Sequence, residues 1–225
     1  MNLAEAQIAV LAENQYQELE LWYPLLRLRE EGANVVVVGP AEQTYGSKLG
    51  YPVTPDLAVA DVDAADFDAV VIPGGFAPEG MRRHKPMIDL VRKVHDQGSL
   101  VAAICHAGWI LASAGIARGR QVTCVALIKD DVIHAGGKYV DEPVVRDGNI
   151  ITSRLPSDLP VFCKEIVSYL KEAPRRRNSA KVLSPSKGRP PVSPSYTHAA
   201  ELTMGPRGTA SADYTTIVKT GERVA

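Results

Sequence analysis

The sequence predicts an α/β protein with a mostly parallel central sheet sandwiched by helices, followed by a disordered C-terminal tail. Short apolar runs rich in β-branched residues alternate with amphipathic segments, an order typical of parallel strands that are buried on both faces. Parallel strands are joined by crossover helices, which cover the sheet. The composition changes near residue 174, and we therefore expect a folded domain over residues 1–173 and a tail over residues 174–225.

The first half of the domain supplies most of the expected sheet. Four apolar runs are its predicted strands: residues 7–12, 34–39, 69–73 and 100–104. Amphipathic helices are expected over residues 16–31 and 85–97, because each pattern is closed by a glycine, Gly32 or Gly98, as is common at helix C-termini.

In the second half of the domain, the sequence predicts shorter helices and strands. A short apolar helix follows Cys105 and runs to Gly115, and residues 121–125 return as a strand. Residues 144–152 form a hairpin whose turn is Asp147-Gly148. A last helix follows residues 156–158, and Pro174 helps to stop it.

The tail differs from the domain in charge and in proline content. Residues 174–225 hold 9 Lys+Arg against 3 Asp+Glu, and 6 of the 16 prolines. The tail also has few large apolar side chains, and their burial could not offset the conformational entropy lost on ordering the segment. This composition predicts disorder. The arginines at 175–177 fit a solvated basic linker, with contact to an acidic partner or to nucleic acid as the alternative.

The overall composition, 45% hydrophobic and 23% charged, is that of an ordinary globular protein. No apolar run approaches the roughly 18 residues of a membrane-spanning helix, and residues 1–7 lack the basic patch of a secretory signal, so we expect a cytoplasmic protein without membrane contact. The three cysteines, Cys105, Cys124 and Cys163, predict free thiols, since their number is odd and they form no CxxC pair. The scattered histidines predict no metal site.

Two loops that follow predicted strands carry unusual residues. Ligands of open α/β sheets bind beyond the carboxyl ends of the strands, so these loops are where a site is expected. Gly74 and Gly75 follow the strand at 69–73 and can leave backbone N–H groups facing a ligand. Cys105 follows the strand at 100–104, with an alanine two residues away on each side, which is the spacing of a nucleophile elbow.

Cys105 is therefore a candidate nucleophile. A thiol at a helix N-terminus is expected to have a lowered pKa, because the free amides and the helix dipole favour the thiolate. The neighbouring His106 could act as a base beside it. The alternative is that Cys105 is a small apolar residue that ends a buried strand.

Four segments in order resemble the PfpI-type branch of the ThiJ/PfpI superfamily. They are residues 16–24 (YQELELWYP), 72–79 (IPGGFAPE), 103–106 (AICH) and 128–131 (IKDD). The resemblance extends over residues 5–172 and does not include the tail.

This resemblance implies a flavodoxin-like three-layer sandwich that assembles into dimers or hexamers, with no cofactor. Cys105 would be the nucleophile, and His106 would pair with Glu79 of a neighbouring subunit. Backbone amides near Gly75, and at His106 or Ala107, would bind the oxyanion. Family activities include hydrolysis of small peptides, conversion of 2-oxoaldehydes to hydroxyacids, deglycation and stress protection.

The sequence departs from the family in one position that matters for catalysis. The family has a glutamate beside the nucleophile, and alignment through Tyr23-Pro24 assigns that position to Gln17. Glutamine cannot ionise, so we expect weakened proton transfer. Two smaller departures are Ala107-Gly108 after the Cys-His pair and Val125 in place of a tyrosine.

The leading hypothesis is a cysteine-dependent hydrolase or a glyoxalase-like or deglycase-like stress-protection enzyme, acting on small 2-oxoaldehydes, their adducts or peptides. The first alternative is a catalytically attenuated redox protein with an oxidisable Cys105, which the assignment of Gln17 motivates. The second is a hydratase of small substrates of the isonitrile type.

Two related classes are excluded by missing elements. Glutamine amidotransferases share the elbow but need a histidine near the end of the domain, and residues 150–172 contain none. Regulators built on this fold append a helix-turn-helix, which the proline-rich tail cannot form, so specific nucleic-acid binding is not expected.

Overall fold

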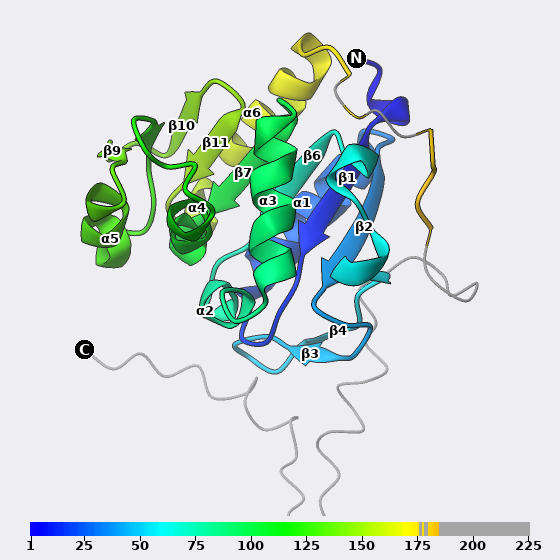
Figure 1. Ribbon diagram of the computed structural model, residues 1–225, viewed down its shortest axis with the longest axis horizontal. Helices are drawn as coiled ribbons and strands as arrows, with labels where there is room; N and C mark the ends of the chain where they lie inside the picture. The colour runs from blue at the N-terminus through cyan, green and yellow to red at the C-terminus, as the bar shows by residue number, and fades with distance from the viewer. Residues whose placement is uncertain (176, 178–179, 185–225) are drawn as a thin grey trace, which may run out of the picture. The chain divides into compact units, whose positions relative to one another are not determined.

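A seven-stranded sheet organises the part of the chain that the computed structural model describes, namely residues 1–175, 177 and 180–184 (Figure 1). The strand order is β10-β11-β7-β6-β1-β2-β5. Their bounds are β1 (Gln7–Leu11), β2 (Asn34–Gly39), β5 (Leu57–Ala58), β6 (Ala69–Ile72), β7 (Leu100–Ile104), β10 (Val144–Asp147) and β11 (Ile150–Ser153). Among these seven, β10 pairs antiparallel with β11 and the other neighbours pair in parallel, which confirms the predicted mostly parallel sheet.

The central strands are buried on both faces, as their apolar sequences predict. Every residue of β1, β6 and β7 is buried. In the register at the centre of the sheet, Val10 lies opposite Val37 on one side and Val71 on the other. Continuous runs of β-branched residues suit such strands because helices cover both faces.

Helices complete a three-layer, flavodoxin-like sandwich. Their bounds are α1 (Glu18–Glu30), α2 (Ala77–Met81), α3 (Lys85–Asp96), α4 (Gly108–Ala114), α5 (Lys129–His134) and α6 (Leu159–Glu172). Helix α1 packs with α6, and α3 packs with α4. Figure 1 shows α3 in front of the strands and α1 behind them.

Four short strands form two small sheets outside the main one. β3 (Tyr45–Gly46) pairs antiparallel with β4 (Pro52–Val53), and β8 (Gln121–Val122) pairs in parallel with β9 (Lys138–Tyr139). The strand predicted over residues 121–125 is therefore shorter than expected and lies outside the main sheet. After β8, single hydrogen bonds replace a ladder: the Thr123 amide donates to the Thr152 hydroxyl at 2.8 Å.

The segment that follows α6 differs from the prediction. The tail was expected to be disordered from residue 174, yet Leu183 is only 3% exposed and Arg177 pairs with Asp68 at 3.0 Å. The Leu183 amide donates to Gln7 at 2.7 Å, and Asn34 donates to the Leu183 carbonyl at 3.0 Å. Buried polar groups at the starts of β1 and β2 thus supply partners that composition alone does not reveal. Residues 176, 178–179 and 185–225 lie outside the described residues.

Candidate active site

Cys105 lies at a sharp turn between β7 and α4. It begins a short 3-10 helix, Cys105–Ala107, and its φ of +62° is in the left-handed region that few residues other than glycine adopt. The side chain is 8% exposed. Backbone strain of this kind persists where the surroundings hold the residue in place, so the expected elbow is present.

Gly74 and Gly75 are glycines because the backbone passes too close to its neighbours for any side chain. A Cβ atom on Gly74 would lie 2.7 Å from the Cys105 Cβ, and one on Gly75 would lie 2.4 Å from the Gln15 carbonyl oxygen. Gly75 also has a φ of +72°, and it forms an antiparallel bridge with Tyr16. The loops after β1 and β6 are thereby held together around the cysteine.

Two backbone amides face the sulfur. The N–H groups of Gly75 and His106 both favour the thiolate, and each lowers the pKa of Cys105 against the larger effect of burial. The sequence predicted Gly75 and either His106 or Ala107 as donors. Ala107 is buried in the turn, and no hydrogen bond from its amide to the sulfur is observed among the described residues.

Glu20, and not Gln17, supplies the carboxylate beside the cysteine. Glu20 is 0% exposed, and its Oε2 accepts a hydrogen bond from the Gly74 amide at 2.8 Å. This oxygen and the Cys105 Cβ both flank Gly74, 2.6 and 2.7 Å from the position that a Cβ atom on Gly74 would take. Gln17 is instead the N-cap of α1, where its side-chain oxygen accepts from the Glu20 amide at 2.9 Å. The assignment of Gln17 to the carboxylate position, and the expected lack of an ionisable group there, are therefore wrong.

The reason for this error is the geometry of a helix start. Helix side chains lean toward the N-terminus, so a residue in the first turn reaches back past the cap. Glu20 is the third residue of α1, and it therefore points back to the loop that contains Gly74. The signal available in the sequence is the interval of three residues from the cap to the glutamate, which is the spacing of a capping box.

Burial changes the acidity of this pair of groups. It raises the pKa of Glu20 to about 7, despite the hydrogen bond from Gly74. Burial and the Glu20 carboxylate raise the pKa of Cys105 to about 12, and together they outweigh the two amides. The expected lowering of the thiol pKa is therefore wrong, and the two groups titrate as one coupled unit.

His106 lies on the other side of the sulfur, with Nδ1 at 3.3 Å from Sγ. Its ring contacts the rings of Phe76 and Trp109, with centroids 6.1 and 5.3 Å away. Trp109 is held in turn by Asp131, which accepts its indole N–H at 2.7 Å. Burial lowers the pKa of His106, and a nearby lysine, Lys48, lowers it further.

Glu79 does not join this group within one chain. It lies exposed on α2 and lines a pocket of about 280 Å³ with Glu13, Arg83 and His84. Among the described residues, no carboxylate contacts the His106 ring. The structure therefore brings together Cys105, His106, Gly74 and Gly75, and it leaves Glu79 and Gln17 outside.

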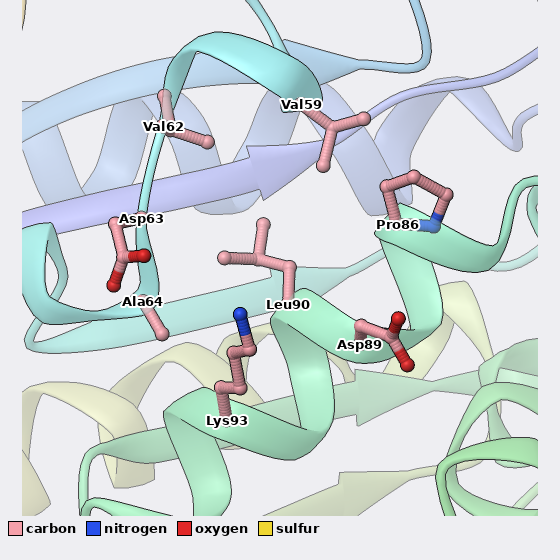
Figure 2. A pocket seen from close by; sticks show the side chains of 8 residues that line it. All are labelled: Val59, Val62, Asp63, Ala64, Pro86, Asp89, Leu90 and Lys93. Atoms are coloured by element: carbon pink, nitrogen blue, oxygen red, sulfur yellow. The ribbon is translucent and has the colours of Figure 1, made fainter.

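A second pocket is lined by none of the predicted site residues. Figure 2 shows it between α3 and the turns that precede β6, with a volume of about 160 Å³. Leu90 and Val59 line it together with the charged side chains of Asp63, Asp89 and Lys93. Asp89 is already paired with Lys85. None of the groups around Cys105 at the elbow therefore lines this second pocket.

Comparison with known proteins relates this chain to one family. Residues 6–169 match the model of the DJ-1/PfpI family. An uncharacterised protein of Archaeoglobus fulgidus is 47% identical over 165 residues, which are 73% of this chain and 98% of that relative. A deglycase of Pyrococcus abyssi is 43% identical over 165 residues, which are 73% of this chain and 99% of the relative.

A solved structure has the same fold. A two-domain protein of Anabaena variabilis, with DJ-1/ThiJ/PfpI-like and ferritin-like domains, superposes with a TM-score of 0.73 and 37% identity. The match covers 78% of this chain and 52% of that protein. In the described part of the present chain, no helix is long and apolar enough to cross a membrane.

Proposed function

The chain belongs to the DJ-1/PfpI family, and on that premise we propose that it is a cofactor-independent, cysteine-dependent enzyme of the deglycase and glyoxalase type, acting on small 2-oxoaldehydes and their adducts. The observation that carries the proposal is the buried Glu20 carboxylate, which lies beside the strained Cys105 and is held there by the Gly74 amide. An acid with a pKa of about 7 beside a nucleophile can both accept and donate protons near neutral pH. The alternative of a catalytically attenuated redox protein was based on the assignment of Gln17 to the carboxylate position beside Cys105. Because Glu20 fills that position, this reason for the alternative no longer holds.

The first step is addition of the Cys105 sulfur to the aldehyde carbon. The thiol proton passes to the Glu20 carboxylate and from there to the aldehyde oxygen, which gives a hemithioacetal and leaves Glu20 ionised for the next step. The amides of Gly75 and His106 already face the sulfur, so they lie close to an oxygen on the carbon bonded to it. They would stabilise the negative charge that develops on that oxygen.

The second step moves hydrogen between the two carbons of the adduct. Glu20 removes the proton from the carbon that bears sulfur and returns a proton to the neighbouring carbon, while the hydroxyl proton passes to the neighbouring oxygen. The first carbon is oxidised by two electrons and the second is reduced by two, so no external oxidant is needed. The product is a thioester of a 2-hydroxyacid.

Water then hydrolyses the thioester and restores the thiol. His106 is suited to accept the proton of this water, because burial and the charge of Lys48 lower its pKa and keep the imidazole neutral. The sum of the steps is one 2-oxoaldehyde plus one water giving one 2-hydroxyacid. With methylglyoxal the product is lactate.

We further propose that a second copy of the chain supplies Glu79 to His106, within a homodimer or hexamer. The exposed position of Glu79 on α2, and the lack of a carboxylate at His106 within the described residues of one chain, support this. Mixing Cys105→Ser subunits with Glu79→Ala subunits should then restore part of the activity that each lacks alone. No recovery in a verified mixed oligomer would contradict a shared site.

The direct test of the function is lactate formation from methylglyoxal. We expect Cys105→Ser to lower the rate at least about 100-fold, because the nucleophile is lost. Cys163→Ala is a matched control, since Cys163 is a buried cysteine of α6 outside the site. Equal rates in the wild type and in Cys105→Ser would contradict the proposal.

A further inference from the structure

The β3–β4 hairpin places Lys48 above Phe76, an aromatic residue that contacts His106. Lys48 lies between β3 and β4, and its amide donates to the Tyr16 carbonyl at 2.9 Å. The Tyr16 hydroxyl donates to the Tyr51 carbonyl at 2.6 Å, which fixes the far arm of the hairpin to the same residue. Since Tyr16 also bridges to Gly75, the hairpin is tied to the loop that holds the cysteine.

The nearest acidic residue on α1 is occupied by this same hairpin. The carboxylate of Glu18 accepts hydrogen bonds from the Ser47 hydroxyl and from the Leu49 amide, the latter at 2.6 Å. Glu18 therefore anchors the hairpin on both sides of Lys48. Among the described residues, Lys48 has no carboxylate within ion-pair distance.

The Lys48 ammonium group lies above an aromatic ring that borders the site. It is 5.4 Å from the centroid of the Phe76 ring, and Phe76 in turn lies 6.1 Å from the His106 ring. Phe76 is 51% exposed, so the ammonium group and the ring together form an open edge of the site. Burial is the main cause of the raised pKa of Glu20 and of the lowered pKa of His106, and the charge of Lys48 acts on both groups as a smaller, lowering effect.

We propose that Lys48 binds a carboxylate carried by the substrate, and that the enzyme prefers 2-oxoaldehydes that bear such a group over neutral ones. This inference rests on the proposed function and names its substrate class. An exposed cation beside an aromatic ring that contacts His106 is a ready partner for an anion, and a charge-assisted hydrogen bond orients as well as attracts. The half-exposed Phe76 ring supports the carbon chain between the two ends of the substrate.

The test compares two substrates with the same reacting group. Methylglyoxal is neutral, whereas 4,5-dioxopentanoate has the same ketoaldehyde with a carboxylate two carbons away. Each takes up one water, and the products are lactate and 2-hydroxyglutarate. The quantity measured is kcat/KM for the anionic substrate divided by kcat/KM for the neutral one, in the full-length protein.

We expect Lys48→Met to lower this ratio about tenfold, mainly through KM of the anionic substrate, and Lys48→Arg to retain most of it. Raising the salt concentration should lower the ratio in the wild type, because the site is open to solvent. Lys164→Met is the matched control, since Lys164 is an exposed lysine of α6, and its ratio should equal that of the wild type. An unchanged ratio in Lys48→Met would overturn the inference.

A binding measurement separates this inference from the proposed function. Pyruvate carries a carboxylate but no aldehyde, so its binding by calorimetry does not depend on turnover. We expect its Kd to rise about tenfold in Lys48→Met and to stay unchanged in Lys164→Met. If the wild type converted neither ketoaldehyde, the proposed function would fail, and equal pyruvate binding in wild type and Lys48→Met would still overturn the assignment of Lys48.

Discussion

At the scale of single residues, Glu20 and Cys105 form one chemical unit. The Glu20 carboxylate is buried beside the Gly74 amide and raises the pKa of the Cys105 thiol, whereas the neutral thiol lowers the pKa of Glu20 against the larger effect of burial. Removal of a proton from one is therefore easier while the other keeps its own. This favours a mechanism in which the sulfur gives up its proton during attack, and it disfavours a thiolate that exists beforehand.

Glu20→Gln provides a test at this scale, because glutamine keeps an oxygen for the Gly74 amide but cannot ionise. We expect turnover of methylglyoxal to fall by about 10² to 10⁴, the usual contribution of a positioned acid or base. In the wild type, kcat/KM should fall as the pH drops below about 7, as the carboxylate is protonated. A variant with wild-type turnover would show that Glu20 has no part in proton transfer.

The same substitution predicts a change in the pH dependence of stability. The folded-state pKa of Glu20 is raised, so the native state holds its proton more tightly than the unfolded chain does, and stability falls as the pH rises through about 7. Glu20→Gln should lack this decline. The difference in free energy of unfolding between the variant and the wild type should therefore grow by about 2 to 3 kcal/mol from pH 5 to pH 8. Urea denaturation at both pH values measures it, and a constant difference would contradict the raised pKa.

The sequence predicts some of these residues and not others for a physical reason. Cys105, Gly74 and Gly75 are constrained by backbone geometry, and this constraint leaves a local pattern of small residues around them. The role of Glu20 in the site depends on the residue at which α1 begins, and a resemblance in nearby residues does not predict that residue. Lys48 depends on the fold of a hairpin that only the three-dimensional structure reveals.

At the scale of elements, the start of α1 positions the acid of the site. Gln17 caps the helix at the Glu20 amide, and the Gln17 amide donates to the Gly74 carbonyl at 3.3 Å. The cap thus ties the first turn to the diglycine loop. Its role is to orient Glu20.

Two substitutions at Gln17 test this role. Gln17→Ala removes the cap, and we expect it to lower the free energy of unfolding by about 1 kcal/mol, with far less loss of turnover than Glu20→Gln causes. Gln17→Glu keeps an acceptor and should not raise turnover, because the acid position is already filled. Thermal unfolding and methylglyoxal turnover measure both effects. A large gain in turnover in Gln17→Glu would restore the view that position 17 is catalytic.

Elements with local signals are those that the sequence predicts well. The runs that became β1, β2, β6 and β7 are apolar throughout, and burial on both faces requires such runs. The predicted strand over residues 121–125 contains β8 but extends beyond it, because its partner β9 is only two residues long. Its length was therefore set by tertiary contacts and not by its own residues.

At the scale of the whole molecule, Arg177 and residues 180–184 contact the end of the sheet opposite the elbow. Leu183 contacts Gln7 and Asn34 at the starts of β1 and β2, whereas the active site lies beyond the ends of β6 and β7. The matched relatives account for only 73% of this chain, and the family match ends at residue 169. Beyond the family match, this chain therefore has further residues that contact the domain at the starts of β1 and β2.

Composition could not predict this contact. Net positive charge and proline content favour a solvated tail, and both are averages over many residues. The contact between this part of the tail and the domain depends largely on a single residue: the Leu183 side chain is buried, and its amide and carbonyl are both hydrogen-bonded to the domain. Arg177 is paired with the fully buried side chain of Asp68. Release of the segment would leave this carboxylate buried without its partner, which is unfavourable in free energy.

Leu183→Ala tests whether the segment is part of the folded unit. Loss of a buried leucine side chain should lower the free energy of unfolding by about 2 to 3 kcal/mol, provided that the segment is docked in solution. Val182→Ala is the matched control, because its neighbouring side chain is 73% exposed and should change stability by no more than about 0.5 kcal/mol. Urea denaturation of the full-length variants gives both values, and lactate formation should stay at the wild-type rate in both, since the site lies at the other end of the sheet. Equal stability of the two variants would mean that residues 180–184 leave the domain in solution, and the domain would then end near Ala173, as its composition suggests.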